Sequence, residues 1–166
     1  GAVLAFNRSD NYGTFANLIT GSGAVRVTSG TVTFSNVNTY TGTTSVAGGR
    51  LITTTANVPG PVATTSGATL EFSQATSGTF AQVISGSGGL AKTGAGTVTL
   101  TGSTSFGPLT VSNGRLTLGA GTLMTGSSAI AVGNVSNTPS TLRLDGSATL
   151  SGSGNVGVAE PSSRRV

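Results

Sequence analysis

The sequence predicts an all-β protein folded as a parallel β-solenoid, in which short strands wind around a narrow apolar tube. Three observations predict this fold: short runs of alternating apolar and small polar residues, glycine-rich breaks between the runs, and repetition of the whole pattern along the chain. Alternation with a period of two places successive side chains on opposite faces of a strand. Repetition lets each turn of a solenoid pack on similar neighbours.

The strand pattern is clearest in residues 85–118. Runs at residues 97–100, 109–111 and 115–118 alternate apolar and polar positions, and Gly, Ser or Asn closes each run. Glycine adopts the positive φ angles that tight corners between strands need. From these strand and corner lengths we expect about 20–22 residues in each turn of the solenoid.

The same pattern occurs earlier, in residues 21–51, about 65 residues before its counterpart. Gly30–Phe34 corresponds to Gly96–Leu100, and Gly49–Leu51 corresponds to Gly114–Leu116. A third, partial copy begins at residues 141–144. We therefore expect one solenoid domain over residues 1–158, with two full repeats and a partial third. Residues 159–166 lose the alternation and form a tail that is either disordered or docks on another molecule.

The apolar positions of the repeats are expected to point into the tube and form its core. They are Val32, Phe34, Val46, Leu51, Leu70, Phe72, Val98, Leu100, Val111 and Leu116. Aromatic residues also recur in register, Phe15 with Phe80 and Tyr40 with Phe106. They either stack inside the tube or form an outer stripe that binds sugars.

Composition supports a folded repeat protein with a surface of hydroxyls rather than charges. Charged residues make up 7% of the chain, whereas about a quarter is usual. Many glycines and few charges are also compatible with disorder, but the apolar residues recur in register with the repeat. The net charge of +4 comes from basic residues that are scattered singly, except in the tail. This scatter argues against nucleic-acid binding, and we expect the single cations to be solvated.

Catalysis is not expected, because the residue types that usually perform it are missing. The chain has no His, Cys or Trp, which excludes histidine triads, thiolate nucleophiles and the usual transition-metal sites. The acids Asp10, Glu71, Asp145 and Glu160 are expected to be isolated on the surface, with about three turns between Asp10 and Glu71. We predict no catalytic residue, no cofactor and no metal site. No apolar run is long enough for a membrane helix, so the chain is not expected to be membrane-embedded.

Residues 86–102 (GSGGLAKTGAGTVTLTG), followed by NGRLTL at 113–118, resemble the autotransporter-associated β-strand repeat, also called the passenger-associated transport repeat. Residues 21–51 are similar, although Val27-Thr28-Ser29 replaces Lys92-Thr93-Gly94-Ala95. The resemblance implies a right-handed parallel β-helix from a passenger domain of a Gram-negative bacterium. It also implies an extracellular or cell-surface location and a structural motif without catalytic residues.

The resemblance implies a non-catalytic stalk or adhesin, whose expected ligands are host or surface glycans. An alternative is a subunit of an extracellular filament built by end-to-end stacking, and a distant third is a β-helix that binds or cleaves polysaccharides. The absence of a capping pattern at either end of the sequence favours end-to-end association. The residues expected to take part in such assembly are Val3, Leu4, Phe6, Val156, Val158, Arg164 and Arg165.

Overall fold

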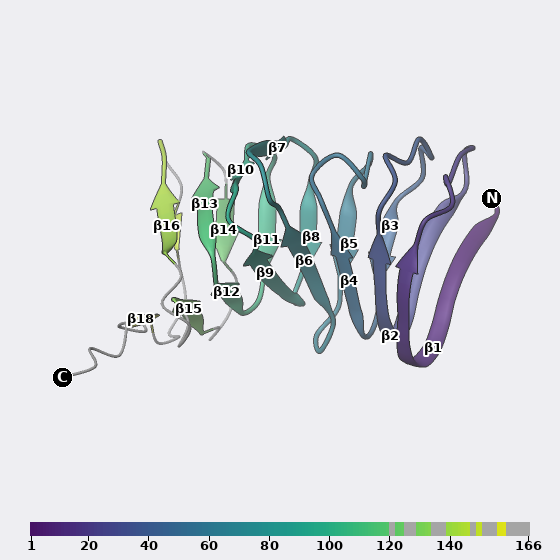
Figure 1. The fold of residues 1–166 in the computed structure, drawn as a ribbon, viewed down its shortest axis with the longest axis horizontal. Coiled ribbons are helices and arrows are strands. Elements are labelled where there is room, and N and C mark those ends of the chain that lie inside the picture. Colours follow the sequence, from purple (N-terminus) through teal and green to yellow (C-terminus); the bar gives the residue numbers. More distant parts are fainter. Residues whose placement is uncertain (120–121, 125–128, 134–138, 147–148, 151–155, 159–166) are drawn as a thin grey trace.

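The computed structural model describes residues 1–119, 122–124, 129–133, 139–146, 149–150 and 156–158. Within these ranges every regular element is a β-strand, and every strand pair is parallel. The strands stack side by side along one axis (Figure 1). This arrangement confirms the predicted all-β solenoid.

Two long strands organise the first turns. β1 (Val3–Phe15) and β2 (Ala24–Phe34) both start on one face of the tube, pass a corner and continue on a second face. The later turns use separate short strands on these two faces. Because β2 runs through the shared corner, the two faces form one 14-stranded sheet.

The first face continues beyond β2 through six short strands. They are β3 (Thr44–Val46), β5 (Val62–Thr64), β8 (Ile84–Gly86), β11 (Thr104–Phe106), β14 (Thr122–Met124) and β17 (Thr149–Leu150). The second face continues through six others. They are β4 (Arg50–Thr53), β6 (Thr69–Ser73), β9 (Gly89–Thr93), β12 (Leu109–Val111), β15 (Ile130–Val132) and β18 (Val156–Val158).

A third face is a separate four-stranded sheet that appears only after the first turns. It consists of β7 (Gly78–Phe80), β10 (Thr97–Leu100), β13 (Gly114–Leu118) and β16 (Ser140–Leu144). Side-chain hydrogen bonds between successive turns join residues that are 18 to 23 positions apart. The turn length predicted from the sequence falls inside this range.

Asparagine amides bridge the third side of the early turns, where no strand forms. Asn38 Oδ1 accepts a hydrogen bond from the backbone N–H of Ile19 at 2.9 Å, and Asn38 Nδ2 donates to the carbonyl of Asn57 at 2.8 Å. Asn57 Nδ2 in turn donates to the carbonyl of Phe34 at 2.8 Å. These bonds satisfy buried backbone groups that a strand ladder would otherwise satisfy.

Alternation along each strand fills the tube with apolar side chains. In β10, Val98 and Leu100 are fully buried, whereas Thr97 and Thr99 face outward and are half-buried. Burying one such aliphatic side chain contributes roughly 1.5–3 kcal/mol. All ten residues expected in the core are at most 2% exposed: Val32, Phe34, Val46, Leu51, Leu70, Phe72, Val98, Leu100, Val111 and Leu116.

The two repeat copies do not lie directly above one another. Val32 pairs with Leu51 on the second face, but their repeat counterparts Val98 and Leu116 pair on the third face. On the second face, the strand pairs lead in three turns from Leu51 to Leu109. Leu116 follows Leu109 in the chain and lies on the next face. The repeat is therefore three turns and one face long, which the sequence comparison alone did not predict.

The corner glycines show the same displacement. Gly49 has a φ of +67° where the chain passes from the first face to the second, and its counterpart Gly114 has +69° where the chain passes from the second face to the third. A Cβ atom at either position would collide with backbone of the previous turn, at Gly30 and Gly96 respectively. Equivalent corner sequences thus serve different corners of the tube.

We expect Leu100→Asp to unfold the turns around β10, because it places a carboxylate without a partner inside the tube, at a cost of several kcal/mol. Chemical unfolding monitored by circular dichroism measures the loss. Thr110→Asp is the matched control, because Thr110 lies on β12 and faces solvent, and it should cost less than about 1 kcal/mol. Equal losses in the two variants would show that Leu100 is not inside the tube.

Candidate functional site

The acids are not isolated, which corrects the prediction from the sequence. Each of the three acids among the described residues pairs with an arginine. Asp145 pairs with Arg143 on β16, with 2.6 Å between Oδ1 and Nε. The remaining acid, Glu160, lies outside the described residues. Each of the three described acids therefore forms an ion pair with a nearby arginine.

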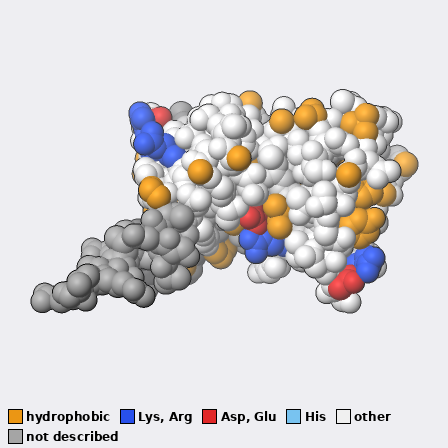
Figure 2. All heavy atoms as spheres, viewed as in Figure 1, with side chains coloured by type: hydrophobic (Ala, Val, Ile, Leu, Met, Phe, Trp, Pro, Cys, Tyr) orange, Lys and Arg blue, Asp and Glu red, His pale blue; other side chains and the backbone are white. Residues whose placement is uncertain are grey.

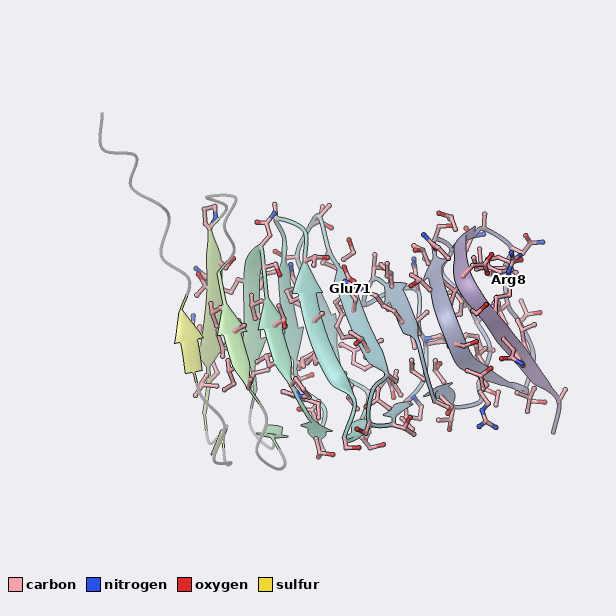
Figure 3. All side chains as sticks on the ribbon, turned by 90° about the horizontal axis from the view of Figure 1, so that it is seen from below. Arg8 and Glu71 are labelled. Atoms are coloured by element: carbon pink, nitrogen blue, oxygen red, sulfur yellow. The ribbon has the colours of Figure 1, made fainter. Side chains whose placement is uncertain are left out.

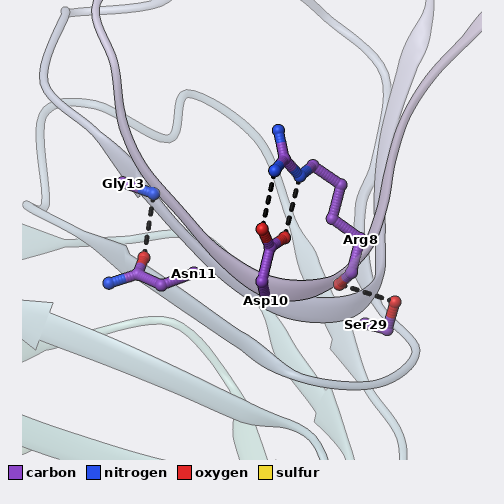
Figure 4. Close-up of polar contacts among 5 residues, drawn as sticks. All are labelled: Arg8, Asp10, Asn11, Gly13 and Ser29. Carbon is purple, nitrogen blue, oxygen red and sulfur yellow. Dashed lines mark hydrogen bonds and ion pairs between the residues drawn. The ribbon is translucent and has the colours of Figure 1, made fainter.

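Arg8 and Asp10 form an exposed pair at the corner of β1 (Figure 4). Arg8 Nε donates to Asp10 Oδ1 at 2.8 Å, and the second guanidinium nitrogen donates to Oδ2 at 2.6 Å. The hydrogen bond from Arg8 lowers the pKa of Asp10. The corner is held further by Ser29 Oγ, which donates to the carbonyl of Arg8, and by Asn11 Oδ1, which accepts from Gly13 N–H. Both charged side chains are exposed, so the pair shapes the corner more than it stabilises the fold.

Glu71 is buried on the outer side of β6, and both of its carboxylate oxygens are in use. Arg50 on β4 donates from Nε to Oε2 at 2.5 Å, and Thr93 on β9 donates from Oγ1 to Oε1 at 2.5 Å. Only 5% of Glu71 is exposed. Figure 3 shows Glu71 well separated along the rod from Arg8, the partner of Asp10. Glu71 and Asp10 are therefore not placed to act as an acid–base pair.

Lys92 is a second charged residue whose burial corrects the prediction from the sequence. It was expected to be solvated, but it is fully buried on β9, one residue before the strand ends. Its Nζ donates to the carbonyls of Thr93 at 2.7 Å, Gly94 at 2.6 Å and Asn113 at 3.2 Å. Burial lowers the pKa of Lys92. Its alternation with Leu90 was the available sequence clue, because residues two apart on a strand share a face.

The recurring aromatic residues lie mostly inside the tube. Tyr40, Phe80 and Phe106 are at most 1% exposed, and Phe15 is half-buried. Phe80 packs against Phe72 with ring centroids 5.2 Å apart. These positions do not form the outer sugar-binding stripe that was the alternative.

The residues expected to take part in assembly are only partly described. Val3 and Leu4 on β1 are 57% and 39% exposed, whereas Phe6 is buried. Tyr12 and Phe15 cover Phe6, with ring centroids at 5.6 and 5.1 Å. The backbone of Val156 and Val158 belongs to β18, which pairs with β15. Arg164 and Arg165 lie outside the described residues.

An open groove of about 380 Å³ lies where β13 begins, beside the exposed Arg115. In the described part of the chain no three His, Cys, Asp or Glu side chains come together as metal ligands. The same residues include no helix that could cross a membrane. The groove is lined by Thr97, Asn113, Arg115 and Thr141, which offer polar groups to a ligand.

We expect Lys92→Met to cost about 3 kcal/mol, because it leaves partly buried carbonyls at Gly94 and Asn113 without their donor. Urea unfolding compared with the unchanged chain measures the cost. Arg26→Met is the control, since Arg26 is an exposed arginine on β2, and it should change stability by less than about 0.5 kcal/mol. If the Lys92→Met protein is as stable as the control, the hydrogen bonds of the ammonium group do not stabilise the fold.

Comparison with known proteins identifies one repeat family, which matches two stretches of the chain. The family model of the passenger-associated-transport-repeat matches residues 29–52 and 90–118. The matched stretches run from β2 to β4 and from β9 to β13. Neither curated proteins nor solved structures give a match. Two stretches of the chain are thus similar to the passenger-associated transport repeat.

Proposed function

We propose that the chain is a rod-like segment of an exported protein of the autotransporter passenger type, and that it acts as a non-catalytic stalk at the cell surface or outside the cell. The observation that carries the proposal is the presence of two matched transport repeats within one parallel solenoid. The repeat and the fold both fit an exported passenger-like protein. This family implies a secreted or surface-exposed location.

The physical properties of the rod support folding after export. Its turns contact mainly their neighbours, so folding can propagate from one turn to the next. The chain contains no cysteine, so its folding needs no disulfide chemistry. Its outward strand positions carry mostly small polar residues, which suits a soluble rod that is not enclosed by other layers.

The charged groups support a non-catalytic role. Glu71 is bound by Arg50 and Thr93, and Lys92 is bound by backbone carbonyls. Neither group is free to exchange a proton with a substrate. General acid–base catalysis needs a titratable group within hydrogen-bond reach of the reacting atoms, and the buried charges of this rod are used for its own support.

The test of the stalk role is to fuse the chain to the translocator of a characterised autotransporter in a Gram-negative bacterium and to digest intact cells with protease. We expect a surface-exposed segment that resists digestion, while the Leu100→Asp variant reaches the surface and is degraded. Polysaccharide, ester and peptide substrates should show no turnover. A folded chain retained inside the cell, or turnover abolished by Glu71→Gln, would contradict the proposal.

A filament subunit is a second candidate, favoured by the outer edge of β1. This edge pairs with no strand of the described chain, and exposed hydrophobic side chains gather at this end of the rod (Figure 2). An open strand edge with apolar neighbours favours pairing with another strand. In a filament, a turn of a second copy would continue the ladder, which is a head-to-tail contact that propagates.

Filament formation predicts association that depends on concentration and on the β1 edge. Sedimentation of the purified chain should show growing particles, and Leu4→Lys should block their growth because charge on an edge opposes pairing. Val83→Lys is the control, because Val83 is 46% exposed but lies in a middle turn. A chain that stays monomeric at high concentration would exclude the filament.

A further inference from the structure

The groove at the start of β13 combines a guanidinium with hydroxyl and amide groups. Arg115 pairs directly with Thr97 on β10 and with Thr141 on β16. Directly paired residues of neighbouring strands point to the same face, at a spacing of about 4.8 Å. Asn113 also lines the groove. One side of the third face therefore presents a basic group between two threonines.

The first repeat contains an equivalent arginine that binds a carboxylate of the same chain. Arg50 is the repeat counterpart of Arg115, and both follow a corner glycine with positive φ. On the next turn Arg50 pairs with Thr69, and two residues further along the strand Glu71 binds its guanidinium. The first repeat thus supplies the carboxylate from its own chain.

The second repeat lacks this carboxylate. Arg115 pairs with Thr141 on the next turn, and the residue two positions further is Arg143 instead of an acid. Arg143 binds Asp145, the residue directly after β16, with 2.6 Å between Nε and Oδ1. No acid among the described residues forms an ion pair with Arg115. Figure 2 shows basic side chains gathered at the end of the rod that carries β16.

We propose that the groove beside Arg115 binds a carboxylate carried by a sugar, which takes the place that Glu71 fills in the first repeat. A guanidinium binds carboxylates through two parallel hydrogen bonds. The hydroxyls of Thr97 and Thr141 and the amide of Asn113 match the donors and acceptors of a sugar ring. The volume of about 380 Å³ suits a small ligand. This site goes beyond the stalk role, and binding by the purified chain can be measured whether or not the chain is exported.

The test is isothermal titration of the purified chain with trigalacturonic acid and with its methyl ester, which has the same sugar rings without free carboxylates. We expect the acid to bind at least ten-fold more tightly than the ester. Arg115→Gln should reduce the affinity for the acid at least ten-fold without changing the melting temperature. Arg26→Gln, on another face, should leave the affinity unchanged.

A reciprocal variant tests the comparison between the repeats. Arg143→Glu places a carboxylate at the position that corresponds to Glu71, so it should occupy Arg115 from within the chain and reduce binding of the acid. Equal binding of the acid and the ester would overturn the proposal, as would unchanged binding by Arg115→Gln or by Arg143→Glu. A tri-glutamate peptide that binds more tightly than the acidic sugar would also overturn it, because the site would then prefer a peptide.

Discussion

The structure depends on the hydrogen bonds between successive turns. Strands inside the stack pair in parallel with the strands of the turns before and after them, so each turn must have the shape of its neighbours. The third side of the early turns has no strand, and there the side-chain amides of Asn38 and Asn57 donate hydrogen bonds to backbone carbonyls of neighbouring turns. Where the chain turns between the second and third faces, the buried ammonium of Lys92 joins carbonyls of adjacent turns. The amides of Asn38 and Asn57 and the ammonium group of Lys92 thus satisfy backbone carbonyls where strands end or the chain turns.

The architecture could be predicted because its causes are local. Alternation in residues 97–100 determines which side chains enter the tube, and the glycines before Arg50 and Arg115 determine where the chain turns. The one-face displacement of the repeats could not be predicted, because it depends on how many residues each corner consumes. Insertions at corners change the length of a turn without changing the strand pattern, so a comparison of sequences gives the repeat length but not the number of faces it spans.

The charges were harder to place than the apolar residues, for a related reason. A lone Glu71 in the sequence looks like a surface acid, and its partners Arg50 and Thr93 lie about one turn away on either side. Such partners come together only through the register of neighbouring turns. The position of Lys92 was in principle readable from its alternation with Leu90, but a cation at an inward position contradicts the usual preference for burying apolar residues. The carbonyl groups that compensate its burial belong to corners, which the strand pattern does not describe.

The repeat length of three turns and one face has a consequence for how a longer rod would look to its surroundings. Each successive copy is rotated by about a third of a revolution around the axis, as Val46 on the first face and its counterpart Val111 on the second already show. An array of such copies would therefore carry any outward residue along a spiral path instead of a straight row. Copies of the same charged residue would not stack on consecutive turns, where they would repel one another. A rod built in this way would present similar chemistry in every radial direction, so its rotational orientation would matter little to a molecule that approaches from the side.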